Sequence, residues 1–433
     1  MEGIISLRFA WKHYGGENQN DSNNYGCTTV SQSNVKSMFS NYVDKESVFK
    51  NKDALTTNYK PDNILHREQQ INDLGSILAP ALKGNDPSNV FLYGSVGTGK
   101  TLIVKHVKDE LKTVAKDKDI DLNVLYINCK MKKVADTEYR LLAKLARQLG
   151  EDVPSTGLPT DEIYNRFFNA LKEQKGVVII ALDEIDALVK KVGDEFLYNL
   201  TRINDDLEET KVSILGISND LNFTEYMDSR VKSSLSEEEI IFPPYNAIEL
   251  REILKERTDK AFVDDSLKDG VISKCSALAA QEHGDARRAL DLLRVAGELA
   301  ERSEVDLIEK EHVDRAQSKI ERDRVVETVR SQPKHSKLVL YTILDMTEEE
   351  DKIATGDVYS EYKDLCTEVD VSELTQRRVS GLISELDMRG VINAKVISKG
   401  RYGRTRQIGV DLSDNIRQQL RDMVEDNFYL KED

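Results

Sequence analysis

The glycine-rich stretch at residues 94–101 restricts the fold of this chain more than any other part of the sequence. A short apolar run, Val90 to Tyr93, precedes it, and a segment with helical periodicity begins at Lys100. A strand, a G-x-x-x-x-G-K-[ST] loop and a helix in this order form a P-loop, which holds phosphates on backbone N–H groups at the positive end of a helix. The sequence therefore predicts a nucleoside-triphosphate site. The residues expected to line it are Gly94, Ser95, Val96, Gly97, Thr98, Gly99, Lys100 and Thr101.

A pair of acidic residues completes the predicted nucleotide site. The apolar run 177–182 predicts a strand buried on both faces of a parallel sheet, and Asp183 and Glu184 follow it directly. We expect Lys100 to reach the β and γ phosphates, and Thr101 and Asp183 to hold Mg²⁺, the latter through water. Glu184 would orient or deprotonate the attacking water. The alternative is a helix N-terminus with ordinary acidic capping.

Two polar residues further along the chain are candidates for the same site. Asn219 follows another predicted strand, 211–218, where it would either sense the γ phosphate or serve as a turn residue. Arg287 lies in the first turn of a predicted helix with Asp285 as its N-cap, and a cation is unfavourable there. A nucleotide phosphate nearby would explain Arg287, and the alternative is an ordinary surface arginine.

The order of the predicted elements divides the chain into four parts. Residues 1–45 are rich in Asn, Ser and Gly and predict a flexible polar tail, in which Met38 is a candidate start site close to the first ordered residues. Strands and helices alternate over 46–243, which predicts an α/β base with a parallel sheet in three layers. Residues 244–330 read as helix only and predict an all-α lid. A separate module occupies 334–433.

Composition describes a protein without membrane segments. The 433 residues are 39% hydrophobic and 32% charged, and the net charge is −16. No apolar run approaches the ~18 residues needed to span a bilayer, and the N-terminus lacks the features of a signal peptide. The four cysteines, at 27, 129, 275 and 366, are widely scattered and form no metal-binding pair. We therefore expect a cytoplasmic location and no membrane partner.

The C-terminal module has the pattern of a winged helix. Helices are predicted at 337–344, 358–365 and 374–389, and a hairpin at 391–410. From residue 388 to residue 410 there are six cations and no acid, which in so acidic a chain is a segregated patch suited to DNA phosphates. The alternative is a solvated hairpin in a protein-binding winged helix. The residues predicted to bind double-stranded DNA are Arg377 and Arg378 on the recognition helix and Lys399, Arg401, Arg404 and Arg406 on the wing.

Taken together, these motifs resemble the archaeal origin-recognition and cell-division-cycle type replication initiators, which are AAA+ ATPases. The resemblance covers the chain from about Val48 to its end. The stretches that carry it are 65–68, 94–101, 182–186, 216–219, 230–235, 242–245 and 284–289. It implies a AAA+ base, a helical lid and a winged helix, with ATP or ADP and Mg²⁺ as cofactors.

The resemblance also implies roles for single residues and for partners. Asn219 matches the first sensor, Arg287 the second, and Arg230 the arginine offered to the γ phosphate of a neighbouring subunit. Tyr245 and Arg257 are implied nucleotide contacts. The segment 130–149 falls where the family carries a helical insertion that also touches DNA. The implied partners are origin DNA, the replicative helicase and other initiator copies, with slow ATP hydrolysis as a switch.

Two further functions remain open at this stage. A DNA-binding transcription regulator would keep a structural nucleotide that is never hydrolysed. A clamp-loader or helicase-like motor is the weaker alternative.

Overall fold

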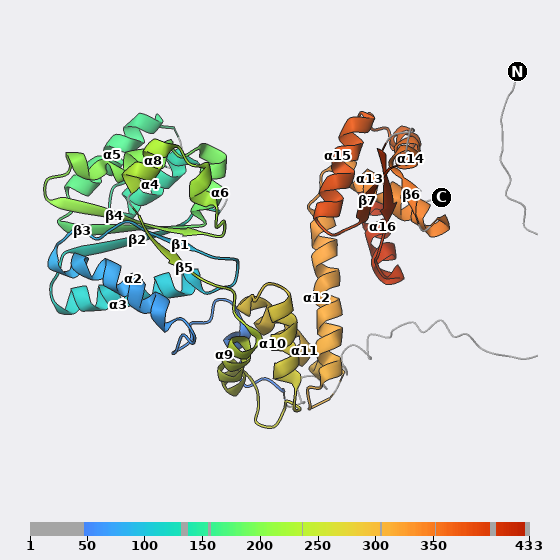
Figure 1. Ribbon diagram of the computed structural model, residues 1–433, viewed down its shortest axis with the longest axis horizontal. Helices are drawn as coiled ribbons and strands as arrows, with labels where there is room; N and C mark the ends of the chain where they lie inside the picture. Colours follow the sequence, from blue (N-terminus) through green and yellow to red (C-terminus); the bar gives the residue numbers. More distant parts are fainter. Residues whose placement is uncertain are drawn as a thin grey trace, which may run out of the picture. The chain divides into compact units, whose positions relative to one another are not determined.

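The computed structural model describes residues 47–130, 137–154, 157–235, 237–303, 305–350, 352–398 and 404–428. Within them an α/β base, a group of lid helices and a winged-helix module follow one another along the chain (Figure 1). The predicted tail at 1–45 lies outside the described residues.

The base is built on a parallel sheet in the order β2-β3-β4-β1-β5. Its strands are β1 (Val90–Tyr93), β2 (Leu122–Asn128), β3 (Gly176–Asp183), β4 (Thr210–Ser218) and β5 (Glu238–Ile241). The strands predicted from apolar runs are confirmed to within one or two residues. Because all strands are parallel, the P-loop after β1, the acidic pair after β3 and the polar residue after β4 meet at one edge of the sheet.

Helices cover both faces of this sheet, which confirms the predicted three layers (Figure 1). Alternate strand residues enter the two cores, Leu92 on one side and Phe91 on the other. One face carries α2 (Glu68–Leu78), α3 (Lys100–Asp117) and the short η2 (Ala79–Lys83). The helices of the other face are α4 (Glu138–Gln148), α5 (Thr160–Lys172), α6 (Ile185–Val192), α7 (Glu195–Thr201) and α8 (Ser229–Leu235), with η3 (Ile203–Asp206) and η4 (Phe223–Tyr226).

The lid helices share a separate core with a segment from the start of the described chain. They are α9 (Ala247–Ala261), α10 (Val271–Gln281) and α11 (Ala286–Arg302). Val48 and Leu55, the latter in η1 (Lys52–Leu55), are buried in this core, and Phe49 stacks on Phe262 with ring centroids 4.8 Å apart. The segment that precedes the base in sequence therefore packs with the lid.

The C-terminal module is a winged helix with more elements than the sequence predicts. The predicted helices correspond to α13 (Lys334–Glu349), α14 (Thr355–Glu368) and α15 (Gln376–Met388), and the hairpin to β7 (Asn393–Ser398) and β8 (Arg404–Gly409). A short strand β6 (Ile353–Ala354) extends the sheet to the order β6-β8-β7. The helix α16 (Asp414–Phe428) and the long helix α12 (Lys310–Arg330) add Leu420 and Val326 to its core.

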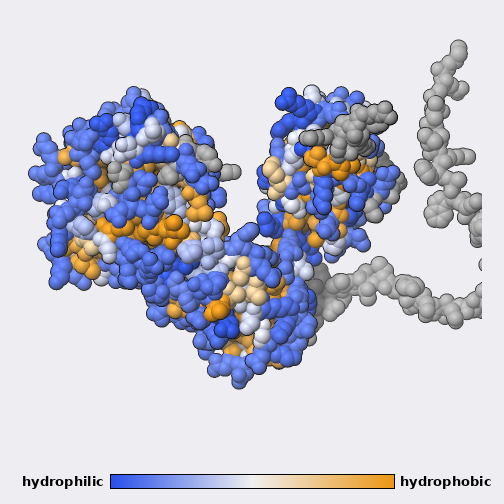
Figure 2. All heavy atoms as spheres, in the orientation of Figure 1, coloured by the Kyte–Doolittle hydropathy of each residue, from blue (hydrophilic) through white to orange (hydrophobic). Residues whose placement is uncertain are grey.

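The surface is mainly hydrophilic, as expected for a chain that buries its apolar residues in several cores. Hydrophilic residues cover most of the face shown in Figure 2, and apolar residues reach it in smaller groups. In the described ranges, no helix combines the length and apolar character that a membrane crossing requires. Cys129, Cys275 and Cys366 are buried free thiols.

Candidate nucleotide and DNA sites

The P-loop connects the end of β1 to the start of α3 and closes around the side chain of Lys100. The Lys100 ammonium donates to the carbonyl oxygens of Gly94 and Ser95 at 2.6 and 2.8 Å. Only 5% of this residue is exposed. Burial lowers the pKa of Lys100 to about 8, although the nearby Asp183 carboxylate opposes the shift. The cation therefore lies inside the loop that the motif predicts to hold phosphates.

Gly97 is the point where the P-loop meets the lid. Its φ of +79° is the left-handed conformation that glycine adopts without strain. A Cβ atom there would collide with the carboxylate of Asp285, and the Ala286 N–H donates to the Gly97 carbonyl at 3.3 Å. The glycine is therefore required both by the turn and by the close approach of α11.

Thr101 and Asp183 provide a hydroxyl and a carboxylate side by side. The Thr101 hydroxyl donates to Oδ2 of Asp183 at 3.0 Å, and Asp183 is 3% exposed at the end of β3. Because the hydroxyl hydrogen is used in this bond, the oxygen lone pairs of Thr101 remain for a cation. Hydroxyl and carboxylate oxygens are the hard ligands that Mg²⁺ prefers. The donor set therefore fits a magnesium ion bound with a nucleotide.

Glu184 and Asn219 follow neighbouring strands at the same edge of the sheet. Glu184 has a φ of +54°, an uncommon conformation for a residue other than glycine and typical of functional turns. Its carboxylate pairs with the Lys130 ammonium at 3.0 Å. The Asn219 N–H donates to Oδ1 of Asp186 at 3.4 Å. The strand order thus brings both predicted residues to the edge that holds Asp183.

Arg287 lies in the first turn of α11, as predicted, and is half exposed. Asp285 accepts a hydrogen bond from its backbone N–H at 2.8 Å and lies 3.4 Å from its guanidinium Nε. Asp285 therefore supplies one anion beside this cation within the protein itself. Burial is the main cause of the lowered pKa of Lys100, and the positive charge of Arg287 adds to it.

Arg67 is a residue of this region that sequence reasoning did not assign to the site. It is 2% exposed, and its guanidinium donates to the carbonyls of Thr98 at 3.0 Å and Pro243 at 2.6 Å. It also lies over the ring of Tyr245, 3.8 Å from the centroid. Arg67 therefore ties the P-loop to the segment that enters the lid. The sequence feature that could have assigned Arg67 to the site is its position in the stretch 65–68, one of those that carry the family resemblance.

The two implied nucleotide contacts of the lid lie in different surroundings. Tyr245 is buried beneath Arg67, and its hydroxyl approaches Gly99 of the P-loop. Arg257 donates to the carbonyl of Ala54 at 3.1 Å and lies over the ring of Tyr59. These contacts give Arg257 a packing role between α9 and η1, and its contact with a nucleotide stays a prediction.

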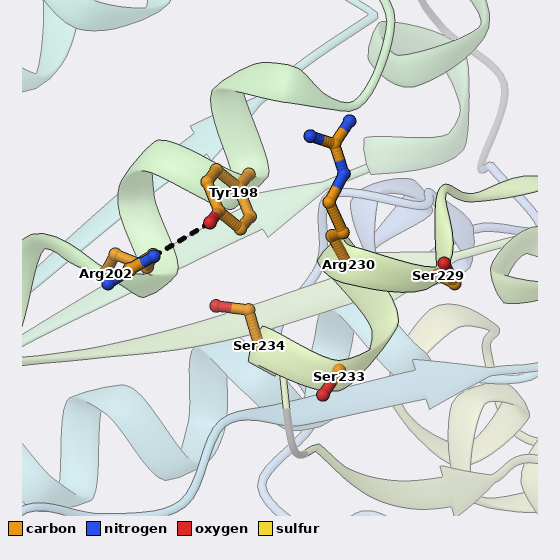
Figure 3. Close-up of a pocket in the computed structure, with 6 residues that line it drawn as sticks. All are labelled: Tyr198, Arg202, Ser229, Arg230, Ser233 and Ser234. Carbon is orange, nitrogen blue, oxygen red and sulfur yellow. Dashed lines mark hydrogen bonds between the residues drawn. The ribbon is translucent and has the colours of Figure 1, made fainter.

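Arg230 stands at the surface of the base. It is paired with Asp228 at 3.1 Å, and 78% of its side chain is exposed. Figure 3 shows a hollow beside it, with Tyr198 and Arg202 of the α7 region across from α8. The residues that line this hollow are Tyr198, Arg202, Ser229, Arg230, Ser233 and Ser234.

The winged helix presents a hollow between its recognition helix and its wing. Arg377 and Arg378 are exposed in the first turn of α15, where Arg378 pairs with Glu385 at 3.4 Å. Arg406 of β8 donates to the backbone and hydroxyl oxygens of Ser380 at 2.8 and 3.0 Å. Arg406 therefore fixes the wing strand to α15. The lining residues are Thr355, Gly356, Gln376, Arg377, Ser380, Val396, Thr405 and Arg406.

The remaining predicted DNA contacts are Lys399, Arg401 and Arg404. Lys399 and Arg401 lie outside the described residues. Arg404 opens β8, where its backbone is paired with that of Ser398. The predicted insertion at 130–149 is described at residue 130 and from residue 137 onward, and it contains α4.

Comparison with protein families places these parts in one known arrangement. Three family models match in succession: an AAA domain over residues 84–222, the Cdc6 AAA+ ATPase-type lid domain over 251–318, and the C-terminal winged helix domain of CDC6 over 327–418. The fold and these matches define a AAA+ ATPase of the Cdc6 type with a winged helix. The predicted fold class is confirmed.

Individual relatives make the assignment more specific. The chain is 53% identical over 395 residues to the ORC1-type DNA replication protein 1 of Methanosarcina mazei, covering 90% of this chain and 94% of that one. It is 52% identical over 384 residues to the corresponding protein of Thermococcus kodakarensis, covering 88% and 92%. The chain belongs to the family of ORC1-type DNA replication proteins, and the predicted family resemblance is confirmed.

A solved structure supports the same assignment. The structure of the Aeropyrum pernix ORC1 protein in complex with DNA matches with a TM-score of 0.79 and 44% sequence identity. The match covers 89% of this chain and 99% of that one.

Proposed function

We propose that this protein is an ATP-regulated replication initiator. It binds double-stranded origin DNA through the winged helix, helps to recruit the replicative helicase, and uses slow Mg²⁺-dependent ATP hydrolysis as a switch. The observation that carries the proposal is the presence, in one chain, of a nucleotide site in contact with its lid and a winged helix with exposed arginines.

The arrangement of the base supports ATP hydrolysis as well as binding. Lys100 would neutralise the phosphates, and Thr101 and Asp183 would hold Mg²⁺, which supplies charge stabilisation of the transferred phosphoryl group. Glu184 would orient the attacking water, with Asn219 beside it. The lid would add Arg287. Because Asp285 closes on Gly97, the position of the lid and the nucleotide in the loop are mechanically connected.

The winged helix supplies the DNA contacts of the proposal. Arg377 and Arg378 would face the groove from α15, while Arg404 and the turn residues Lys399 and Arg401 would contact the backbone or the minor groove. Arg406, held by Ser380, would set the angle of the wing. The similar Aeropyrum pernix ORC1 protein, whose structure was solved in complex with DNA, supports DNA binding by this chain.

Other initiator copies are expected as partners because Arg230 is exposed at the surface of the base. Arg230 is free to move from Asp228, since an exposed pair of this kind is worth little. In an assembly of initiator copies it would reach the γ phosphate of a neighbour, so hydrolysis would depend on that neighbour. An initiator acts where the chromosome lies, which supports a cytoplasmic, nucleoid-associated location.

The proposal is tested by mapping the chromosomal DNA bound by the protein in cells. We expect sharp occupancy at one or a few replication start sites, altered in Glu184→Ala and unchanged in the matched control Glu208→Ala, which removes an exposed carboxylate elsewhere in the base. Many promoter-proximal peaks that are indifferent to Glu184→Ala would instead establish a transcription regulator with a structural nucleotide.

A further inference from the structure

The carboxylate of Asp183 is held by more than its P-loop neighbour. Strands β2 and β3 are paired in parallel with Asn128 opposite Asp183, which brings the end of β2 to the acidic pair. The phenol of Tyr126 donates to Oδ2 of Asp183 at 2.5 Å. The Asn128 amide lies 3.4 Å from the same oxygen. Tyr126 thus makes the shortest of the side-chain contacts that converge there, since the Thr101 bond is 3.0 Å long.

The ring of Tyr126 is itself fixed in place. The ammonium groups of Lys105 and Lys108 lie over it, 5.2 and 6.0 Å from its centroid. Both lysines belong to α3, the helix that begins with Lys100 and carries Thr101. The Tyr126 carbonyl also accepts a hydrogen bond from Gln148 of α4 at 3.2 Å. The phenol oxygen therefore has a defined position between α3 and the end of β3.

A fixed donor on one oxygen determines which way the carboxylate faces. A carboxylate has two oxygens, and it turns about the bond that carries it when its donors are weak. In the described part of the chain, the side-chain hydrogen bonds of Asp183 all end on Oδ2. A short bond to an ionised acceptor is the strongest kind of neutral-donor hydrogen bond. The phenol therefore leaves Oδ1 free to act toward a cation.

We propose that Tyr126 is a positioning residue for the metal-binding carboxylate of Asp183. Its phenol orients Asp183 for Mg²⁺ without contacting nucleotide or metal. Residues that hydrogen-bond to metal ligands in this way typically change metal affinity 10- to 100-fold when they are mutated. The inference rests on the magnesium–nucleotide site of the proposed function.

The test compares wild type with Tyr126→Phe, which keeps the ring under the two lysines and removes only the hydroxyl. The full chain is loaded with a fluorescent ADP analogue carrying a methylanthraniloyl group, and MgCl₂ is titrated from an EDTA-treated start. We expect the Mg²⁺ concentration at half-maximal binding to rise about tenfold in Tyr126→Phe. Affinity for the analogue in EDTA, and the melting temperature without nucleotide, should match wild type.

The control variant is Tyr139→Phe, which removes a phenol that donates instead to the Pro154 carbonyl at 3.3 Å. This variant should keep the wild-type Mg²⁺ midpoint. An unchanged midpoint in folded Tyr126→Phe, or an equal shift in Tyr139→Phe, would overturn the inference and leave the proposed function standing. Absence of any Mg²⁺ dependence in wild type would overturn both.

Discussion

Replacement of Arg67 by alanine gives the sharpest test of how the nucleotide site is built. The buried guanidinium donates to two carbonyls, that of Thr98 in the P-loop and that of Pro243 at the entry to the lid. Hydrogen bonds from a charged group contribute about 1.5–3 kcal/mol each, so two bonds at the lower value give about 3 kcal/mol. The face of Tyr245 adds to this, since a desolvated cation–π contact is worth about 2 kcal/mol. We therefore expect the unfolding free energy to fall by at least about 3 kcal/mol.

For a domain of about 150–250 residues, a loss of about 3 kcal/mol in unfolding free energy corresponds to a fall in melting temperature of about 6–12 °C. Circular dichroism of the full chain during heating measures the shift, and binding of a fluorescent nucleotide should weaken in parallel because the P-loop loses its anchor. Arg251→Ala, which truncates an exposed arginine on α9, is the matched control. A melting temperature for Arg67→Ala no lower than that of Arg251→Ala would refute the reasoning.

Three further predictions concern the phosphate loop, the lid contact and the wing. Burial sets the pKa of Lys100 at about 8, so the free protein loses the cation as pH rises through that value, and nucleotide affinity should be flat below pH 8 and fall above it by up to about tenfold per pH unit. A fluorescent-nucleotide titration from pH 7 to 9.5 measures this, Lys100→Arg should flatten the profile, and a flat wild-type profile would contradict it. Gly97→Ala and its control Gly84→Ala share a positive φ and a backbone cost of about 1–2 kcal/mol, but only at Gly97 does the added methyl group collide with Asp285. Nucleotide affinity should therefore drop in Gly97→Ala and not in Gly84→Ala, and equal affinities would refute the lid contact. The double variant Arg404→Ala with Arg406→Ala should lose DNA affinity and reduce the slope of log affinity against log salt by about 1 in fluorescence anisotropy, since Arg404 is the proposed phosphate contact of the pair and Arg406 is held by Ser380. Unchanged affinity and slope would argue against the wing as the DNA contact.

The parts of the structure that local sequence encodes were predictable. Each strand of the base contains a short apolar run that ends at a glycine, a proline or a polar residue, and the P-loop is defined by spacing alone. The edge that gathers Lys100, Asp183 and Asn219 follows from parallel strands, since their carboxyl ends must meet. The helix start at Ala286 was predictable because Asp285 is a typical N-cap.

Contacts between distant residues were not predictable in this way. Nothing near Arg67 in sequence indicates that its guanidinium would lie over the ring of Tyr245, because Tyr245 is far along the chain. The same holds for Val48 and Leu55, whose lid partners follow after the entire base. Asp285 places an anion 3.4 Å from the guanidinium of Arg287, a contact that the sequence pattern did not predict. The helix α16 was not predicted, although Ile416, Leu420 and Val424 form an apolar stripe at helical spacing.

The long helix α12 shows why the parts of this chain are not independent. Its first half contributes Val313 and Ala316 to the lid core, and its second half contributes Val326 and Val329 to the winged-helix core. The helix has 21 residues and is about 30 Å long, with no glycine or proline to bend it. The lid core also holds the start of α11, which contacts the P-loop at Gly97. A displacement of the lid would therefore move the first half of α12. The second half of α12 belongs to the core of the winged helix, so this one helix contributes side chains to both the lid core and the winged-helix core.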